Sequence, residues 1–199
     1  MSCAWGCRLR QDGAALAVTL FLVVAVLAIG IAAAQAALSA EKQARSERDR
    51  QVALLAAEAA LRDAERDIEG GATPARTVLF APGSTTGFVA GCGRREQPNA
   101  GLCMRTSPVP AWQSVDLAAT GEEARAVAYG AFTGAVMATG GGAAPSRPPR
   151  YIIEALPVRR AGEDASAPMP NVYRITAMGF GARASTRVVL QSVYRKVAP

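Results

Sequence analysis

The stretch AALAVTLFLVVAVLAIGIAAAQAALSA, residues 14–40, contains no charged residue. Its first twenty residues are long enough to cross a hydrocarbon layer of about 30 Å as a helix. The chain continues as EKQARSERDRQVALLAAEAALRDAERDIE, residues 41–69, and the first glycine or proline after position 40 is Gly70. We therefore predict one helix from Ala14 to Glu69, about 84 Å long, whose first half is a membrane-spanning or signal segment.

The second half of this helix has an apolar stripe flanked by charged residues. Its members recur at alternating steps of three and four: Leu54, Ala57, Leu61, Ala64 and Ile68. Such a stripe is typical of a helix that docks on a globular domain, and the pair Gly70-Gly71 predicts a left-handed C-cap that ends it. A plain coiled-coil stalk is the alternative, although the stripe lasts for only two heptads.

The flanks of the apolar block predict its orientation. Arg8 and Arg10 precede it, which favours a cytoplasmic N-terminus and export of the C-terminal bulk of the chain. A cleaved secretory signal, cut within the small residues from Ile31 to Ala37, is an open alternative. Against it, the apolar run is too long, and no turn residues follow it.

Composition limits the function classes. A chain of 199 residues and 20.6 kDa has room for one modest globular domain, and it contains no histidine, the commonest general base. The acid pairs Glu122-Glu123 and Glu163-Asp164 are adjacent in sequence and have no neighbouring nucleophile. No glycine-rich phosphate-binding motif occurs either. We therefore predict a protein that is not an enzyme and needs no cofactor.

The net charge of +6 arises mainly near the C-terminus. Residues 41–69 carry eight acids and six bases, whereas residues 147–196 carry nine bases and three acids. This surplus could attract anionic partners such as DNA, a surface polysaccharide or an acidic protein face. A solvated arginine-rich surface is the simpler interpretation, since no aromatic residues interleave with the bases.

The four cysteines form two pairs on opposite sides of the apolar block. Cys92 and Cys103 enclose the turn-rich GRREQPNAGL, so that an exported chain would form a disulfide between them. A zinc site is the alternative, but C-x-x-C spacing and histidine partners are missing, and we predict no metal. Cys3 and Cys7 lie before the apolar block.

The remaining sequence predicts a sheet. Residues 71–150 are rich in glycine and proline and indicate loops with short elements, with a flexible linker from Thr139 to Arg150. YIIEALPV, VYRITAMGF and TRVVLQSVYR have the β-branched and aromatic residues of strands, and GFGARAS supplies the last turn. We expect an α+β fold in which an antiparallel sheet packs against the amphipathic half of the long helix.

The leader RLRQDG, ending in Gly13 and followed directly by the apolar block, resembles the class III signal of type IV prepilins. The stretches GAALAVTLFLVVAVLAIGIAA, RDRQVALLAAEAALRDAE, YGAFTG, RPPRYIIE and YRITAMGFGARASTRVVLQSVYR are similar to recurring segments of PilX minor pilins. The resemblance implies cleavage by prepilin peptidase between Gly13 and Ala14, with methylation of the mature chain. It also implies four parts: a leader (1–13), a transmembrane and filament-core helix (14–40), its amphipathic continuation (41–70) and a globular pilin domain (71–199).

One position departs from the pattern of major pilins. Their fifth mature residue is a glutamate that pairs with the N-terminal amine of a neighbouring subunit, and here that residue is Val18. A buried unpaired ammonium is costly, so that a subunit without this carboxylate fits the filament tip best, where no such neighbour exists. Loss of a dispensable charge pair is the other interpretation.

The resemblance thus implies a minor pilin that helps to initiate pilus assembly and presents a tip adhesin. It would reside in the inner membrane before assembly and in a periplasmic or extracellular pilus afterwards. Its partners would be prepilin peptidase, other minor pilins and the major pilin. A minor pseudopilin of a type II secretion system is one alternative, and a membrane-anchored module that binds DNA or polysaccharide is another.

Overall fold

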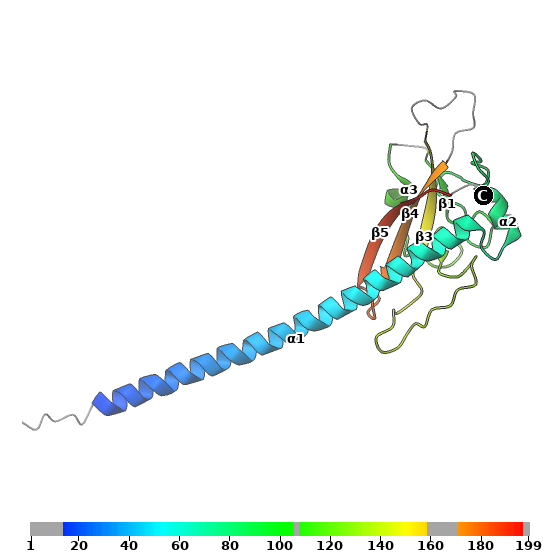
Figure 1. Cartoon of the computed structure of the whole chain (residues 1–199). Helices are drawn as coiled ribbons and strands as arrows, with labels where there is room; N and C mark the ends of the chain where they lie inside the picture. Colours follow the sequence, from blue (N-terminus) through cyan, green and yellow to red (C-terminus); the bar gives the residue numbers. More distant parts are fainter. Residues whose placement is uncertain (1–13, 106–107, 159–170, 197–199) are drawn as a thin grey trace, which may run out of the picture. The chain divides into compact units, whose positions relative to one another are not determined.

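The computed structural model describes residues 14–105, 108–158 and 171–196, and its first element is the predicted helix. Helix α1 runs from Ala14 to Glu69 without interruption, as the sequence indicated. The chain divides into two compact units between Ser46 and Glu47, which are described separately here. Figure 1 shows α1 and the elements of the second unit.

The second unit contains the end of α1, several short elements and three long strands. In chain order the elements after α1 are α2 (Pro74–Thr77), the 3-10 turn η1 (Val78–Phe80), β1 (Leu102–Met104), α3 (Ala111–Ser114), β2 (Val127–Ala128), β3 (Arg150–Pro157), β4 (Asn171–Phe180) and β5 (Arg187–Tyr194). The three long strands coincide with the predicted ones, and the region before them has the predicted loops and short elements.

The five strands form one mixed sheet in the order β1-β3-β4-β5, with β2 also paired to β3. The strand pairs β3–β4, β4–β5 and β2–β3 are antiparallel. The predicted antiparallel arrangement of the three long strands is confirmed, whereas β1 adds a parallel pair that was not predicted, with Leu102 opposite Ile153. The long connection between β1 and β3 allows this, because parallel neighbours need a crossover rather than a tight turn.

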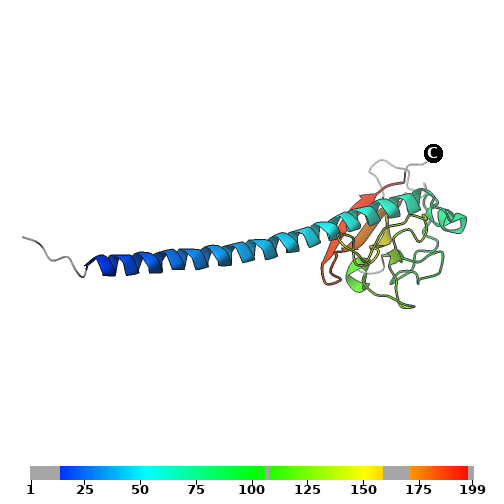
Figure 2. The ribbon, with the colours of Figure 1, turned by 90° about the horizontal axis from the view of Figure 1, so that it is seen from below.

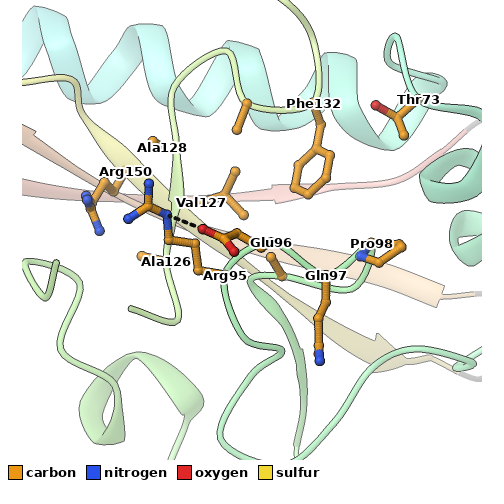
Figure 3. Close-up of a pocket in the computed structure, with 12 residues that line it drawn as sticks. Thr73, Arg95, Glu96, Gln97, Pro98, Ala126, Val127, Ala128, Phe132 and Arg150 are labelled. Atoms are coloured by element: carbon orange, nitrogen blue, oxygen red, sulfur yellow. Dashed lines mark ion pairs between the residues drawn. The ribbon is translucent and has the colours of Figure 1, made fainter. Parts of the chain in front are cut away.

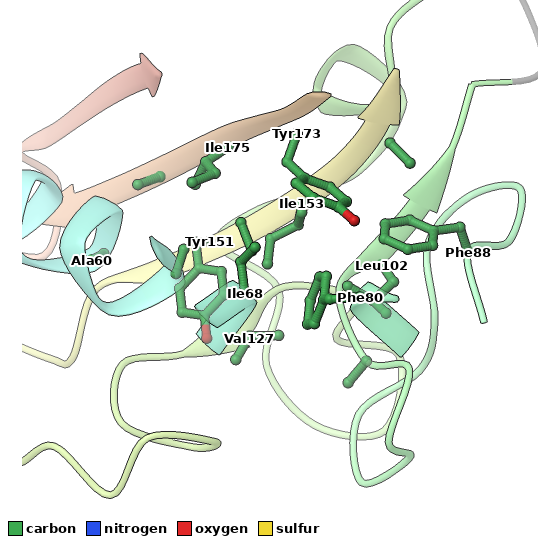
Figure 4. Packing of buried hydrophobic residues seen from close by; sticks show 14 residues of the cluster. Ala60, Ile68, Phe80, Phe88, Leu102, Val127, Tyr151, Ile153, Tyr173 and Ile175 are labelled. Atoms are coloured by element: carbon green, nitrogen blue, oxygen red, sulfur yellow. The ribbon is translucent and has the colours of Figure 1, made fainter. Parts of the chain in front are cut away.

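The part of α1 in the second unit packs on one face of the sheet, as Figure 1 and Figure 2 both show. Tyr173, Ile175 and Ala177 share this face as predicted, and they are buried in one cluster with Ile68 of α1. Figure 4 shows how Phe80 completes this core, with its ring edge-on to Tyr173 at 5.6 Å between centroids.

The buried face of α1 includes Ala57, Ala64 and Ile68 of the predicted stripe but not its two leucines. Leu54 is 37% exposed and Leu61 is only partly buried. The buried residues are instead mostly small, together with three aspartates: Asp49, Ala53, Ala56, Ala57, Ala60, Asp63, Ala64, Asp67 and Ile68. The sheet approaches the helix too closely for leucine, so that small side chains occupy the interface.

Gly179 of β4 marks the closest approach between helix and sheet. A Cβ at this position would lie 2.0 Å from the carbonyl oxygen of Ala53 and 2.5 Å from the backbone nitrogen of Ala57. Only glycine fits against the helix backbone here. Strand β4 can therefore pack directly on the backbone of α1 because position 179 has no side chain.

A second buried cluster covers the opposite face of the sheet. It joins Ile152 of β3 to Leu117 and the cysteine pair, with Trp112 packed against it. The segment predicted as a flexible linker is also attached to the sheet: the Ser146 amide donates to the Gly181 carbonyl at 2.8 Å. The flexible-linker interpretation is wrong at this end of the segment.

Candidate assembly and recognition surfaces

Residues 14–40 form a helical surface that is apolar on all sides. Its large apolar side chains are all more than half exposed, with Phe21 at 72%. The hydroxyl of Thr19 donates to the Leu16 carbonyl at 2.9 Å, which satisfies this polar group within the helix. The segment is long and apolar enough to cross a membrane. A helix that is apolar all round requires lipid or other apolar helices around it.

The residues predicted to govern processing lie at the start of this surface. Ala14 begins α1, and Gly13 lies outside the described residues. Val18 follows one turn later and is 56% exposed, so that its side chain is available to a neighbouring molecule. The cleavage site and the significance of Val18 stay predictions.

The predicted disulfide between Cys92 and Cys103 is confirmed. Both side chains are fully buried in the cluster that includes Ile152, and Cys103 itself belongs to β1. The bond connects the start of the turn-rich loop to a strand of the sheet. The zinc alternative is wrong, because both sulfur atoms are used in the bond.

An ion pair that the sequence did not predict holds this loop against α1. The guanidinium of Arg76 donates from Nε to both carboxylate oxygens of Asp67, at 3.0 and 3.1 Å, and from Nη2 to Oδ2 at 2.7 Å. Its Nη1 donates to the carbonyls of Pro98 and Ala100 at 2.7 and 2.6 Å. Arg76 and Asp67 are almost completely buried. Such a pair tolerates burial because its hydrogen bonds are satisfied.

Two aromatic residues complete the surroundings of this ion pair. The Arg76 guanidinium lies 3.9 Å from the ring centroid of Phe132, and the Tyr151 hydroxyl donates to Asp67 Oδ2 at 3.1 Å. Burial, and secondarily the charge of Asp67, raises the pKa of Tyr151 well above its usual value. The phenol therefore remains a hydrogen-bond donor at any physiological pH. The Arg76–Asp67 pair thus links α1, β3 and two loops.

Asp63, one turn before Asp67, holds a different loop. Its carboxylate accepts hydrogen bonds from the Gly130 amide at 2.7 Å and from the Thr133 hydroxyl. This loop carries Phe132, the residue stacked on Arg76. Asp63 and Asp67 therefore position the same region from two successive turns of the helix.

Asp49 fastens α1 to the turn between β4 and β5. Its carboxylate accepts hydrogen bonds from the Thr186 hydroxyl, the Arg183 amide at 3.1 Å and Arg183 Nε at 2.9 Å. The Thr186 hydrogen bond, followed by those from Arg183, lowers the pKa of Asp49 to about 2 although burial opposes this. The carboxylate is charged throughout the physiological range.

Internal contacts use much of the C-terminal basic surplus. Arg174 donates to buried Glu154 at 3.0 Å, and Lys196 donates to the Ile68 carbonyl at the end of α1 at 2.8 Å. Arg147 and Arg150 donate to the carbonyls of Ala118 and Ala119. Of these bases, Arg174 is paired with a carboxylate, whereas the carbonyl partners of Arg147, Arg150 and Lys196 fix their orientation and leave their charge in place.

A pocket of about 380 Å³ lies beside the disulfide-bonded loop. Most of its lining is apolar, including Val127 and Phe132, while Arg95, Glu96 and Arg150 contribute charge. Figure 3 shows the two arginines on the opposite side of the pocket from Phe132 and Thr73. The pocket is concave and of a size that suits a small ligand or a peptide side chain.

Sequence reasoning missed the three buried aspartates and the pocket. A signal for the aspartates exists: the positions 49, 53, 56, 60, 63 and 67 follow steps of three and four and contain only alanine and aspartate. Aspartate in such a stripe normally indicates a solvent-facing position, so hydrophobicity alone does not place the three aspartates on the buried face. The pocket has no local signal, since its lining comes from five separate stretches of the chain.

Comparisons with known families cover both regions of the molecule. Residues 94–196 match the model described as "Type IV pilus assembly protein PilX C-term", and residues 12–62 match the model described as "PilX N-terminal". No curated protein and no solved structure gave a significant match. The first match alone spans more than half of the chain and includes the whole sheet.

Proposed function

This chain belongs to the PilX family of type IV pilus minor pilins, and we propose that it helps to initiate pilus assembly at or near the filament tip. PilX pilins are structural components of the pilus rather than enzymes. The observation that supports the tip position is that the first half of α1 has no ionisable side chain between Ala14 and Ala40.

The tip proposal follows from the charge of a processed N-terminus. In a packed filament, the new ammonium group of one subunit needs a carboxylate from its neighbour, because an unpaired buried charge is costly. Val18 has no carboxylate to offer, and the nearest acid in the helix is Glu41. At the tip there is no further subunit whose ammonium group needs a carboxylate, so that Val18 leaves no buried charge unpaired there.

We also propose the following processing and topology. Prepilin peptidase removes residues 1–13 by cutting between Gly13 and Ala14, and the cytoplasmic N-terminus leaves the globular part outside the inner membrane. Residues 14–40 then anchor the subunit in lipid until assembly, and 41–70 and 71–199 form the exported part. The Arg8 and Arg10 flank and the exposed apolar helix support this arrangement.

A subunit at the tip would present its globular unit to partners rather than to further layers of pilin. We propose that these partners are other minor pilins and a tip adhesin. The hydrogen bonds and ion pairs that fix the loops of this unit to α1 support a recognition role, because pre-organised loops lose little entropy on binding.

The tip proposal is tested by adding the missing carboxylate. In a strain lacking the native gene, the variants Val18→Glu and Val18→Gln are compared with the wild type in sheared, purified pili. We expect the Glu variant to enter the shaft in several-fold larger amounts, and the Gln variant to match the wild type. Equal amounts of all three would contradict the tip argument, as would immunogold labelling along the whole shaft for the wild-type subunit.

The processing proposal has a separate test. Gly13→Ala should block cleavage and leave a full-length band, while an Ala15→Gly variant should still be processed. Mass spectrometry of the native product identifies its first residue. A first residue near position 38 would instead indicate an ordinary cleaved export signal.

A further inference from the structure

The pocket beside the disulfide-bonded loop has an apolar wall. Phe132, Ala131 and Val127 line it, with Pro98 and Ala100 from the disulfide-bonded loop. Its volume of about 380 Å³ lies within the range of ligand pockets in proteins. A branched or aromatic side chain could fill such a space and lose its contact with water.

Positive charge concentrates at one side of this pocket. Arg95 and Arg150 both line it, and Arg147 lies close enough to act on the charge of Arg150. Burial, followed by the charges of Arg147 and Arg95, lowers the pKa of Arg150. The acids nearby are Asp116 and Glu96, and three arginines therefore outnumber them.

Arg95 is the arginine with capacity for an incoming anion. Its side chain is 55% exposed, and within the described part of the chain its ion-pair partner is Glu96, with 4.0 Å between Arg95 Nε and Glu96 Oε1. That distance is longer than a hydrogen bond. Arg150, in contrast, already donates to the Ala119 carbonyl. A carboxylate placed between the two arginines would gain hydrogen bonds that Glu96 does not make.

The pocket is built before any ligand arrives. The carbonyls of Pro98 and Ala100 are fixed by Arg76, and the disulfide closes the loop that carries Arg95. Glu96 has a φ of 71°, a left-handed conformation that costs free energy for a residue other than glycine. Such strain is more common at ligand-binding loops than elsewhere, and here it lies at the pocket rim.

We propose that this pocket binds a peptide segment of a partner pilus subunit, in which an apolar side chain stands next to a carboxylate. The apolar side chain would occupy the space beside Phe132 and Val127, and the carboxylate would bridge Arg95 and Arg150. The identity of the partner rests on the proposed function, since a minor pilin meets other pilins. The mostly apolar lining disfavours nucleic acid, which needs arginine and lysine side chains spread along a groove and aromatic side chains on which nucleobases stack.

The test uses the full-length protein in detergent micelles and fluorescein-labelled peptides, followed by fluorescence anisotropy. One capped peptide contains Gly-Leu-Glu-Gly, and its control contains Gly-Leu-Gln-Gly. A second pair ends in Gly-Leu with either a free carboxylate or an amide, which distinguishes a side-chain carboxylate from a chain terminus. We expect at least one acidic peptide to bind about tenfold or more tightly than its neutral control.

Variants assign the binding to this pocket. Arg95→Ala should weaken the acidic peptide about tenfold, whereas Arg94→Ala, which removes the same charge one residue away from an exposed non-lining position, should change it less than about twofold. Glu96→Gln should strengthen binding, because it removes a competing carboxylate. Ala131→Trp should abolish binding by filling the pocket while leaving the circular dichroism spectrum unchanged.

Several outcomes would overturn the proposal. These are equal binding of acidic and neutral peptides, equal effects of Arg94→Ala and Arg95→Ala, and competition by a single-stranded DNA oligonucleotide as effective as unlabelled acidic peptide. The Val18 incorporation experiment does not depend on this pocket. If the peptides do not bind but the Val18 variants enter pili as expected, the pocket proposal alone is rejected. If the Val18 variants do not enter pili as expected, the proposed function is rejected.

Discussion

The two halves of helix α1 have opposite surfaces. Residues 14–40 have large apolar side chains exposed on every side, whereas residues 49–68 bury a face of alanine and aspartate against their own domain. Large side chains maximise contact with lipid or with other helices. Small ones let a sheet approach the helix backbone and leave room for aspartates that anchor loops. The buried half of α1 is therefore marked by small residues and aspartates rather than by large apolar side chains.

The largest expected effect lies in the buried half. Arg76→Ala leaves the Asp67 carboxylate buried without its partner and should lower the free energy of unfolding by about 3 to 5 kcal/mol. The control is Arg66→Ala, because Arg66 is 57% exposed and pairs weakly with Asp63 at 3.4 Å. Urea unfolding of the full-length chain in detergent measures both. Similar losses would show that the buried ion pair does not hold the loops.

The close approach of sheet to helix gives the next largest effect. Gly179→Ala forces β4 away from Ala53 and should cost about 3 kcal/mol through overpacking. Gly141→Ala is the matched control, since its added methyl group meets no atom within 4 Å. Thermal unfolding followed by circular dichroism compares the two. A stable Gly179→Ala protein would mean that helix and sheet can separate without loss.

The tie between α1 and the β4–β5 turn predicts a pH dependence. The folded pKa of Asp49 is about 2, below its ordinary value of 3.8, so that the carboxylate contributes stability above about pH 4 that is lost as pH falls toward 2. Asp49→Asn should cost on the order of 1 kcal/mol at pH 7, a modest value because Arg183 is exposed and screened by solvent.

The advantage of wild type over Asp49→Asn should therefore shrink between pH 4 and pH 2, as read from urea midpoints at each pH. Glu47→Gln, which removes an exposed carboxylate two residues earlier, serves as the control in the same pH series. A constant difference for Asp49→Asn would exclude the proposed charge-assisted network.

The smallest effect on stability should come from the exposed half. Phe21→Ala should change the unfolding of the globular unit by less than about 0.5 kcal/mol, because Phe21 is 72% exposed and belongs to the other compact unit. Phe80→Ala, which removes a fully buried ring, should cost about 3 to 5 kcal/mol. If Phe21→Ala destabilised the globular unit comparably, the two halves of α1 would not be independent.

Much of the fold could be predicted from local patterns. The unbroken helix and its end at Glu69 follow from the uninterrupted run of helix formers and from Gly70, whose positive φ of 140° suits glycine at the helix end. The strands β3, β4 and β5 follow from their β-branched and aromatic residues. The disulfide was predicted from the cysteine spacing in a chain expected to be exported.

The parts that sequence reasoning missed depend on contacts between distant segments. Nothing near Arg76 indicates that its guanidinium is buried, because its partners Asp67, Pro98, Ala100 and Phe132 come from other stretches of the chain. The type II secretion alternative, by contrast, was decided in favour of the pilus by family membership rather than by geometry.

The long helix, its apolar first half, the three long strands and the family can all be read from the amino-acid sequence, because they depend on periodicity and on neighbouring residues. The burial of the aspartates of α1, the parallel pairing of β1 with β3 and the pocket shared by Arg95 and Arg150 emerge once the chain is folded. Burial and charge pairing depend on the surroundings of a side chain, so that the same aspartate is a solvated charge on an isolated helix and an anchor once a sheet and an arginine lie against it.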